Sequence, residues 1–125
     1  MYEVSKQVEF SAAHQVRESG GACERVHGHN WRVVAAVRAA ALDEVGMVID
    51  FKDLKRALHA VVDPLDHVLL SEVAPFDERN PTSENLARYI FDELCQRLED
   101  GRVVVQRVEV WETATSRACY ERDGG

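Results

Sequence analysis

The sequence predicts an α+β fold in which two helices pack on one face of a four-stranded antiparallel sheet. Two stretches of alternating apolar and polar residues, 2–14 and 27–39, come first along the chain. Two segments with apolar residues at helical spacing follow them. A Val-rich stretch at 102–112 and a shorter one at 115–122 complete the chain. Strands and helices that segregate in the order β-β-α-α-β-β are typical of this class.

The length of 125 residues indicates one domain, spanning 1–125, with enough chain for a real core. Hydrophobic residues at 46% and charged residues at 30% are ordinary for a soluble globular protein. No apolar stretch approaches the roughly 20 residues of a membrane span, and the N-terminus lacks a signal-peptide pattern. Three cysteines, an odd and small number, fit a reducing compartment. We therefore expect a cytoplasmic protein that does not contact a membrane.

The net charge of −7 argues against a general nucleic-acid surface, because proteins of that class usually carry basic patches. The same charge repels anions at long range. An anionic substrate therefore needs a local basic pocket, for which Arg17, Arg25 and Lys52 are candidates that the sequence does not place.

The first two strands carry histidines on the same parity as their apolar residues. In 2–14 only Lys6 interrupts that parity. The set in the first strand is Val4, Val8, Phe10, Ala12 and His14, and in the second it is His27, His29, Trp31, Val33, Ala35 and Val37. Residues i and i+2 of a strand point to one face. If the strands pair as a hairpin joined by the Gly-containing loop 15–26, the three histidines meet across the ladder.

Capping residues and prolines mark the two predicted helices. Asp50 is a suitable N-cap for the first, and Pro64 ends it. Thr82 is a suitable cap for the second, and Gly101 closes it. Residues 66–80, between the helices, are expected to be mostly loop.

One carboxylate lies on an apolar parity. Glu112 follows Val108 and Val110 at the end of the third strand. A carboxylate on a largely apolar face is costly unless something pairs with it. Its position therefore favours a functional role.

His14, His27 and His29 have the pattern of a metal site. Neutral imidazole is the commonest protein metal ligand, and three of them on Zn²⁺ leave a fourth position for water or substrate. The alternative is three satisfied polar side chains in a hairpin, which the shared parity disfavours. All-imidazole sites favour zinc over iron or copper, although ligand type alone does not fix the metal.

Two further groups have both functional and ordinary interpretations. Cys23 is a candidate catalytic thiolate, which a nearby cation would favour, but it is also a candidate fourth zinc ligand or a plain loop thiol. Asp66 and His67 form a proton-transfer pair if the carboxylate orients the imidazole. They are equally compatible with a polar loop.

Six ordered motifs together resemble the 6-pyruvoyl-tetrahydropterin synthase / 6-carboxy-tetrahydropterin synthase (QueD-like) family. They cover the chain almost end to end. They are F-S-A-A-H at 10–14, C-E-R-V-H-G-H-N at 23–30, G-M-V-I-D-F at 46–51, L-D-H at 65–67, N-P-T-S-E at 80–84 and W-E-T at 111–113.

The resemblance implies roles for individual residues. His14, His27 and His29 match the zinc ligands of the family, and Cys23 matches its catalytic cysteine. Asp66 with His67 matches the acid/base pair. Glu112 matches the glutamate that anchors the pterin ring, since a carboxylate accepts two parallel N–H bonds. Thr113 and the Thr82–Ser83 region are expected to add hydrogen bonds to the substrate.

The resemblance also implies the tunnelling fold, or T-fold, in which trimers close a twelve-stranded barrel and two trimers stack into a homo-hexamer. Three residues separate Cys23 from His27, as in the bacterial carboxy-forming branch. The expected enzyme is a zinc-dependent lyase, 6-carboxy-5,6,7,8-tetrahydropterin synthase. It converts 7,8-dihydroneopterin triphosphate to 6-carboxytetrahydropterin, with release of triphosphate and acetaldehyde, in queuosine or other 7-deazapurine biosynthesis. The alternatives are formation of 6-pyruvoyl-tetrahydropterin and a non-catalytic pterin- or metal-binding module.

Overall fold

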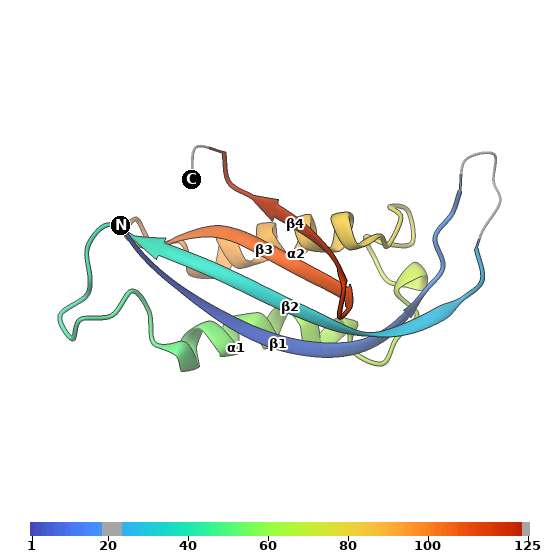
Figure 1. Ribbon diagram of the computed structural model, residues 1–125, viewed down its shortest axis with the longest axis horizontal. Helices are drawn as coiled ribbons and strands as arrows, with labels where there is room; N and C mark the ends of the chain where they lie inside the picture. The colour runs from blue at the N-terminus through green and yellow to red at the C-terminus, as the bar shows by residue number, and fades with distance from the viewer. Residues whose placement is uncertain (19–23, 124–125) are drawn as a thin grey trace.

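A computed structural model of the chain, which describes residues 1–18 and 24–123, has one antiparallel sheet with two helices on one face (Figure 1). The strand order follows the chain, β1-β2-β3-β4. The strands are β1 (Tyr2–His14), β2 (His27–Ala39), β3 (Val104–Thr113) and β4 (Ser116–Glu121), and the helices are α1 (Phe51–Val62) and α2 (Ser83–Leu98). The predicted α+β class and the order β-β-α-α-β-β are confirmed.

The β1–β2 hairpin has the register that the alternating pattern predicts. Its Cα partners run without interruption from Tyr2↔Ala39 to His14↔His27. Because no bulge shifts this ladder, the apolar parity of both strands faces the helices along the whole hairpin. In β1 the burial alternates as expected from Val8 to His14, and Lys6 is half-buried.

The predicted caps of both helices are present. The Asp50 side chain accepts a hydrogen bond from the Lys52 backbone N–H, and Thr82 accepts one from that of Asn85. Pro64 does not simply stop α1 but lies in a 3₁₀ turn, Asp63–Leu65, that continues its path. Within 66–80 the structure adds one short 3₁₀ turn, Leu70–Glu72.

The expectation that Gly101 closes α2 is wrong in detail. The helix ends at Leu98, and its C-cap Glu99 is in an extended conformation. Gly101 has a φ of 92°, and it makes the left-handed turn that leads into β3. The glycine therefore serves the helix–strand connection rather than the helix end.

The core lies between the sheet and the helices. Its largest fully buried side chains include Trp31, Phe76, Leu54, Leu58, Leu86, Ile90 and Leu94. The opposite face of the sheet carries paired charges instead: Glu3 binds both Arg38 and Arg107. Among the described residues, no helix has both the length and the apolar character needed to cross a membrane.

Replacing the N-cap of α1 should cost stability without affecting the histidine end of the hairpin. We expect Asp50→Ala to lower the free energy of unfolding by about 1 kcal/mol, because the Lys52 N–H loses its acceptor. Urea unfolding at fixed protein concentration measures this loss. Asp50→Asn is the control, since asparagine also caps helices. An equal loss in both variants would show that the side-chain bond is not the cause.

Candidate metal centre

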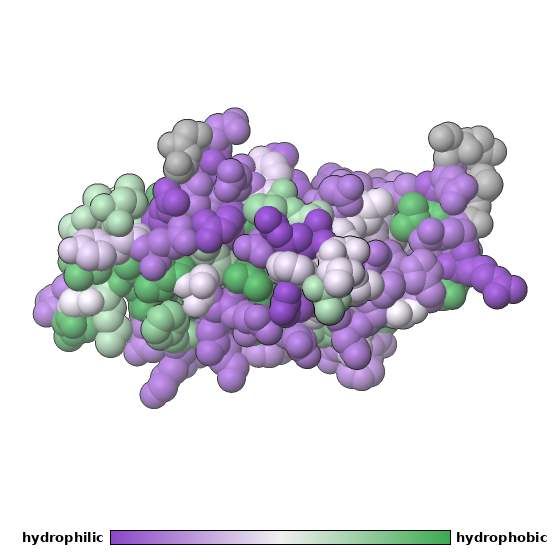
Figure 2. Space-filling model, in the orientation of Figure 1, coloured by the Kyte–Doolittle hydropathy of each residue, from purple (hydrophilic) through white to green (hydrophobic). Residues whose placement is uncertain are grey.

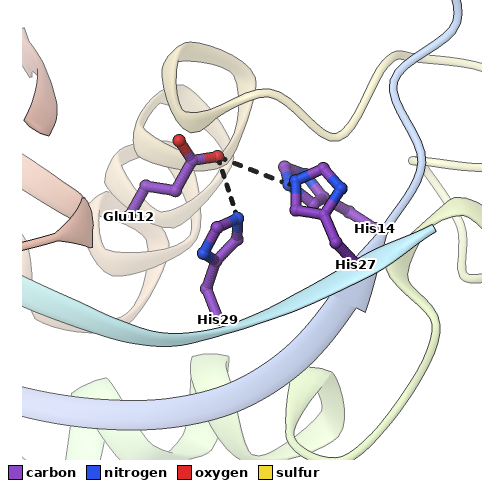
Figure 3. Close-up of side chains that lie close together, drawn as sticks. All are labelled: His14, His27, His29 and Glu112. Carbon is purple, nitrogen blue, oxygen red and sulfur yellow. Dashed lines mark hydrogen bonds and ion pairs between the residues drawn. The ribbon is translucent and has the colours of Figure 1, made fainter. Parts of the chain in front are cut away.

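The three histidines meet at the end of the β1–β2 hairpin, as the sequence predicts (Figure 3). His14 and His27 are direct partners across the ladder, and His29 lies opposite Ala12. The ring centroids lie 4.5 Å apart for His14 and His27, and 4.8 Å apart for His27 and His29. The regular hairpin register thus brings three imidazoles to one point.

Two backbone carbonyls determine which ring nitrogens carry protons. His14 Nδ1 lies 2.8 Å from the carbonyl oxygen of Pro81, and His27 Nδ1 lies 2.8 Å from that of Arg25. A carbonyl oxygen only accepts hydrogen bonds, so each Nδ1 must be the donor. In the neutral rings the Nε2 atoms of His14 and His27 then carry lone pairs.

These lone pairs point toward each other at short distance. The Nε2 atoms of His14 and His27 are 3.0 Å apart. His29 Nε2 is buried and has no hydrogen-bond partner among the described residues. Lone pairs this close repel unless a cation lies between them. Since a second ring nitrogen bonded to a carbonyl is also the usual arrangement of a metal-bound histidine, the donor set fits a divalent metal ion.

The surroundings hold the rings in place and favour the neutral form of His29. His14 is 1% exposed, and the indole ring of Trp31 packs edge-on against both His14 and His29. Trp31 is itself anchored by a hydrogen bond from its Nε1 to the carbonyl oxygen of Ala12. Burial lowers the pKa of His29, against the opposite effect of the Glu112 carboxylate. A lowered pKa favours the neutral imidazole, which is the form that binds metal.

The N-P-T-S-E segment supports His14 from the other side of the site. Pro81 supplies the carbonyl that accepts from His14. The Asn80 side chain is tied to the backbone of Arg17, accepting from its N–H and donating to its carbonyl. The sequence predicts that Thr82 caps α2, which is confirmed, and that the Thr82–Ser83 region adds hydrogen bonds to the substrate, which stays a prediction. In the structure the segment joins α2 to the end of β1.

Glu112 belongs to the same cluster. Its Oε1 lies 3.3 Å from His14 Nε2 and 3.4 Å from His29 Nε2. The ligand atoms of these residues and His27 all lie within 4.8 Å of one another. The sequence singled out Glu112 for its apolar parity but did not group it with the histidines. The parity that Glu112 shares with the apolar residues of its strand was the signal that could have grouped it with the histidines.

The side chains of Asp66 and His67 are in contact, a point that the sequence left open. The Asp66 Oδ2 lies 2.9 Å from His67 Nδ1, and its Oδ1 accepts from the Ser11 backbone N–H at 2.8 Å. The Ser11 N–H and then the His67 ring lower the pKa of Asp66. His67, with a φ of 58°, lies with His29 in the wall of a surface hollow of about 500 Å³.

The other predicted site residues are less informative. Cys23 lies outside the described residues. Thr113 is exposed at the end of β3, where its hydroxyl accepts from the Thr115 N–H. The Arg17 guanidinium donates to the Phe76 carbonyl. Lys52 is in the first turn of α1, which begins at the end of the molecule away from the histidines (Figure 1).

Comparison with known proteins decides the family. The model of a family described as 6-pyruvoyl tetrahydropterin synthase matches residues 3–123. The chain is 39% identical to the 6-carboxy-5,6,7,8-tetrahydropterin synthase of Synechocystis, covering 96% of this chain and 93% of the relative. It is 34% identical to the human 6-pyruvoyl tetrahydrobiopterin synthase, covering 95% and 90%.

The chain belongs to the 6-pyruvoyl tetrahydropterin synthase family. The relatives named 6-carboxy-5,6,7,8-tetrahydropterin synthase also include that of Bacillus subtilis, 35% identical over 99% of this chain and 88% of the relative. The solved structure of the Caenorhabditis elegans 6-pyruvoyl tetrahydropterin synthase superposes with a TM-score of 0.84 at 26% identity, covering 98% of this chain and 96% of that one. The T-fold and the lyase family that the motifs predict are therefore confirmed.

Binding of a divalent ion should stabilise this family member through the converging nitrogens. At a free ion concentration of a hundred times the Kd, we expect the free energy of unfolding to rise by about 2.7 kcal/mol. Replacement His27→Ala should abolish most of this gain. The matched control is His59→Ala, because the two side chains are similarly exposed, at 40% and 39%. Thermal unfolding with and without metal measures the effect, and equal losses in both variants would contradict the site.

Asp66 should make stability depend on pH in the acid range. Its folded-state pKa is lowered, so its contribution is present above the unfolded value near 3.8 and is lost as pH falls through the folded value. In Asp66→Asn the amide oxygen can still accept from Ser11, but the charge is lost. We expect the stability difference between wild type and Asp66→Asn, measured by urea unfolding of the metal-free chain, to shrink below about pH 4. A constant difference down to pH 2 would be the opposite result.

Proposed function

We propose that the chain is a zinc-dependent 6-carboxy-5,6,7,8-tetrahydropterin synthase acting on 7,8-dihydroneopterin triphosphate. The observation that carries the proposal is the convergence of three imidazoles, in two of which, His14 and His27, a backbone carbonyl accepts the Nδ1 proton and leaves the Nε2 lone pair facing the centre. Such a trio can hold an ion and still leave it a position for substrate. The relatives that bear this name are 28–42% identical over nearly the whole chain, which supports the choice of reaction.

Zinc is the proposed metal because a site built of imidazole ligands suits it. When bound, it supplies Lewis-acid stabilisation of negative charge on the side-chain oxygens of the substrate. His14, His27 and His29 are its proposed ligands. In the neutral rings of His14 and His27 the carbonyl bonds place the proton on Nδ1, so no proton must leave their Nε2 atoms when the ion binds.

Proton transfer is assigned to Cys23, His67 and Asp66. Cys23 as thiolate takes a carbon-bound proton from the substrate side chain. His67 donates its Nδ1–H to Asp66, so its Nε2 is free to accept a proton and return it. Triphosphate leaves by elimination, and addition of one water molecule with cleavage of a side-chain carbon–carbon bond then gives 6-carboxytetrahydropterin and acetaldehyde.

Substrate binding is assigned to Glu112 and Thr113. The Glu112 carboxylate can accept two parallel N–H bonds from the pterin ring, one from the ring nitrogen and one from its amino group. Thr113, the next residue, is exposed and can add a further bond. Arg17 and Arg25, near the hairpin end, are the proposed cations for the triphosphate.

Assembly into a homo-hexamer of single-domain subunits, in the cytoplasm, completes the proposal. Strands β1 and β4 are the edges of the described sheet, and closing a barrel would remove those edges. Apolar side chains also gather at the end of the molecule where α1 begins (Figure 2). The exposed residues there include Tyr2, Val45, Met47 and Phe51, a kind of patch that is typical of interfaces.

The second candidate is the formation of 6-pyruvoyl-tetrahydropterin from the same substrate. The human relative with that activity in its name is 34% identical, close to the values of several carboxy-named relatives. The short interval from Cys23 to His27 favours the carboxy product. A non-catalytic binding module is the third alternative, and turnover by purified protein would exclude it.

Product analysis separates these functions directly. Incubation of the zinc-loaded protein with 7,8-dihydroneopterin triphosphate should release acetaldehyde and triphosphate in equal amounts, with 6-carboxytetrahydropterin detected by mass spectrometry. Triphosphate without acetaldehyde would indicate the pyruvoyl product. The release of neither would contradict both enzymatic assignments.

Replacement Cys23→Ala should abolish turnover, at least a hundredfold, because the proton-abstracting group is lost. Zinc content, measured on the same sample, should stay near that of the wild type. Cys95→Ala is the control, since burial raises the pKa of that thiol to about 11 and leaves it unreactive. If Cys23→Ala loses its zinc instead, the thiol is a ligand and its role as a base is wrong.

A further inference from the structure

The proposed role of Glu112 and the position of its side chain in the structure differ. The proposed function gives its carboxylate to the pterin ring. In the structure the carboxylate lies against the imidazoles instead, 3.3 Å from His14 Nε2 and 3.4 Å from His29 Nε2 (Figure 3). The carboxylate cannot contact the imidazoles and the pterin ring at the same time. It must leave one position to occupy the other.

Two distances in the cluster, those from Glu112 to His14 and to His29, match the spacing of neighbouring ligands of a single ion. With metal–nitrogen and metal–oxygen bonds near 2.0–2.1 Å, the edge of a coordination tetrahedron is about 3.3–3.4 Å. The contacts from Glu112 to both histidines have this length.

A direct hydrogen bond does not explain the contact with His14. The Nδ1 proton of that ring is donated to Pro81, so its neutral Nε2 has no proton for Glu112. A carboxylate oxygen facing a lone pair is repulsive without a cation. The ion that fits between the His14 and His27 lone pairs therefore also accounts for the contact of Glu112 with His14.

The backbone around Glu112 leaves the side chain free to move. The β3–β4 register shifts between Trp111 and Thr113, where Trp111 pairs with Arg117 and Thr113 with Ser116. Glu112 is the extra residue of this bulge and has no partner in the ladder, and bulges commonly redirect a side chain beside a functional site. Its side chain is 32% exposed. Rotation of this carboxylate breaks no strand pairing.

We propose that Glu112 is the fourth ligand of the metal when no substrate is bound, and that substrate binding releases it to the pterin ring. The release step rests on the proposed function. One metal–oxygen bond to Glu112 breaks and one to a side-chain oxygen of the substrate forms, with no change in oxidation state. The carboxylate that leaves the ion then accepts the N–H groups of the ring. Recognition of the pterin ring and release of a coordination position on the metal thus occur together.

This exchange makes the site selective as well as reactive. In the empty enzyme the carboxylate reduces the charge of the ion and excludes water and free phosphates from it. A ligand that lacks the pterin N–H groups forms no hydrogen bonds with Glu112 to replace its bond to the metal. Only a molecule with both the ring and the side-chain oxygens replaces the lost bond on the carboxylate and on the ion.

Cobalt substitution tests the ligand directly, because the visible absorption of Co²⁺ reports its ligands. We expect Glu112→Gln to change the substrate-free Co²⁺ spectrum and to weaken Co²⁺ affinity about ten- to a hundredfold. Glu109→Gln is the matched control, since Glu109 is also on β3 but binds Trp111 and the neighbouring arginines. Identical spectra and affinities for wild type and Glu112→Gln would overturn the proposal.

Neopterin tests the release, because it has the ring and the hydroxyls but no triphosphate to eliminate. Its binding, followed by pterin fluorescence, should shift the wild-type Co²⁺ spectrum and should shift that of Glu112→Gln much less. Bound neopterin with an unchanged wild-type spectrum would overturn the release. Failure of neopterin to bind at all would count against pterin recognition, hence against the proposed function, while the comparison of the two substrate-free proteins would still decide the ligand.

Discussion

The candidate centre depends on two hydrogen bonds from imidazole Nδ1 atoms to backbone carbonyls. Pro81 and Arg25 accept these bonds, and both Nε2 lone pairs are thereby turned toward one point. Without them either ring could donate from Nε2, and the 3.0 Å contact between His14 and His27 would be an ordinary hydrogen bond. With them, two neutral rings turn their lone pairs toward each other, an arrangement that fits a bound cation. The fit to a metal ion thus follows from main-chain groups as well as from the histidines themselves.

The carbonyl of Pro81 lies in a segment that also has other structural roles. Pro81 directly precedes Thr82, the N-cap of α2, so the start of that helix also fixes the ring of His14. The Asn80 side chain ties the same segment to Arg17, just beyond the end of β1. Helix start, strand end and metal ligand are therefore mechanically coupled. A substitution of Asn80 or Pro81 is therefore expected to shift the ring of His14.

The hairpin and its histidines were predictable because both depend on a short-range period. Alternation along β1 and β2 set the buried parity, and an unbroken register carried His14 to His27. The Pro81 carbonyl was not predictable, because it lies 67 residues from His14 and has no side-chain signal. The orientation of Glu112 was hidden for another reason: it depends on a bulge that interrupts the very period used to assign its face. The contact of Asp66 with the Ser11 N–H likewise joins distant segments.

A crystal structure of the zinc-loaded, substrate-free protein, with the ion located by anomalous scattering, tests the convergence of lone pairs most directly. We expect one ion about 2.0–2.1 Å from the Nε2 atoms of His14, His27 and His29, with both Nδ1–carbonyl bonds intact. An ion held through Nδ1 atoms, or rings turned away from one another around an empty centre, would contradict it.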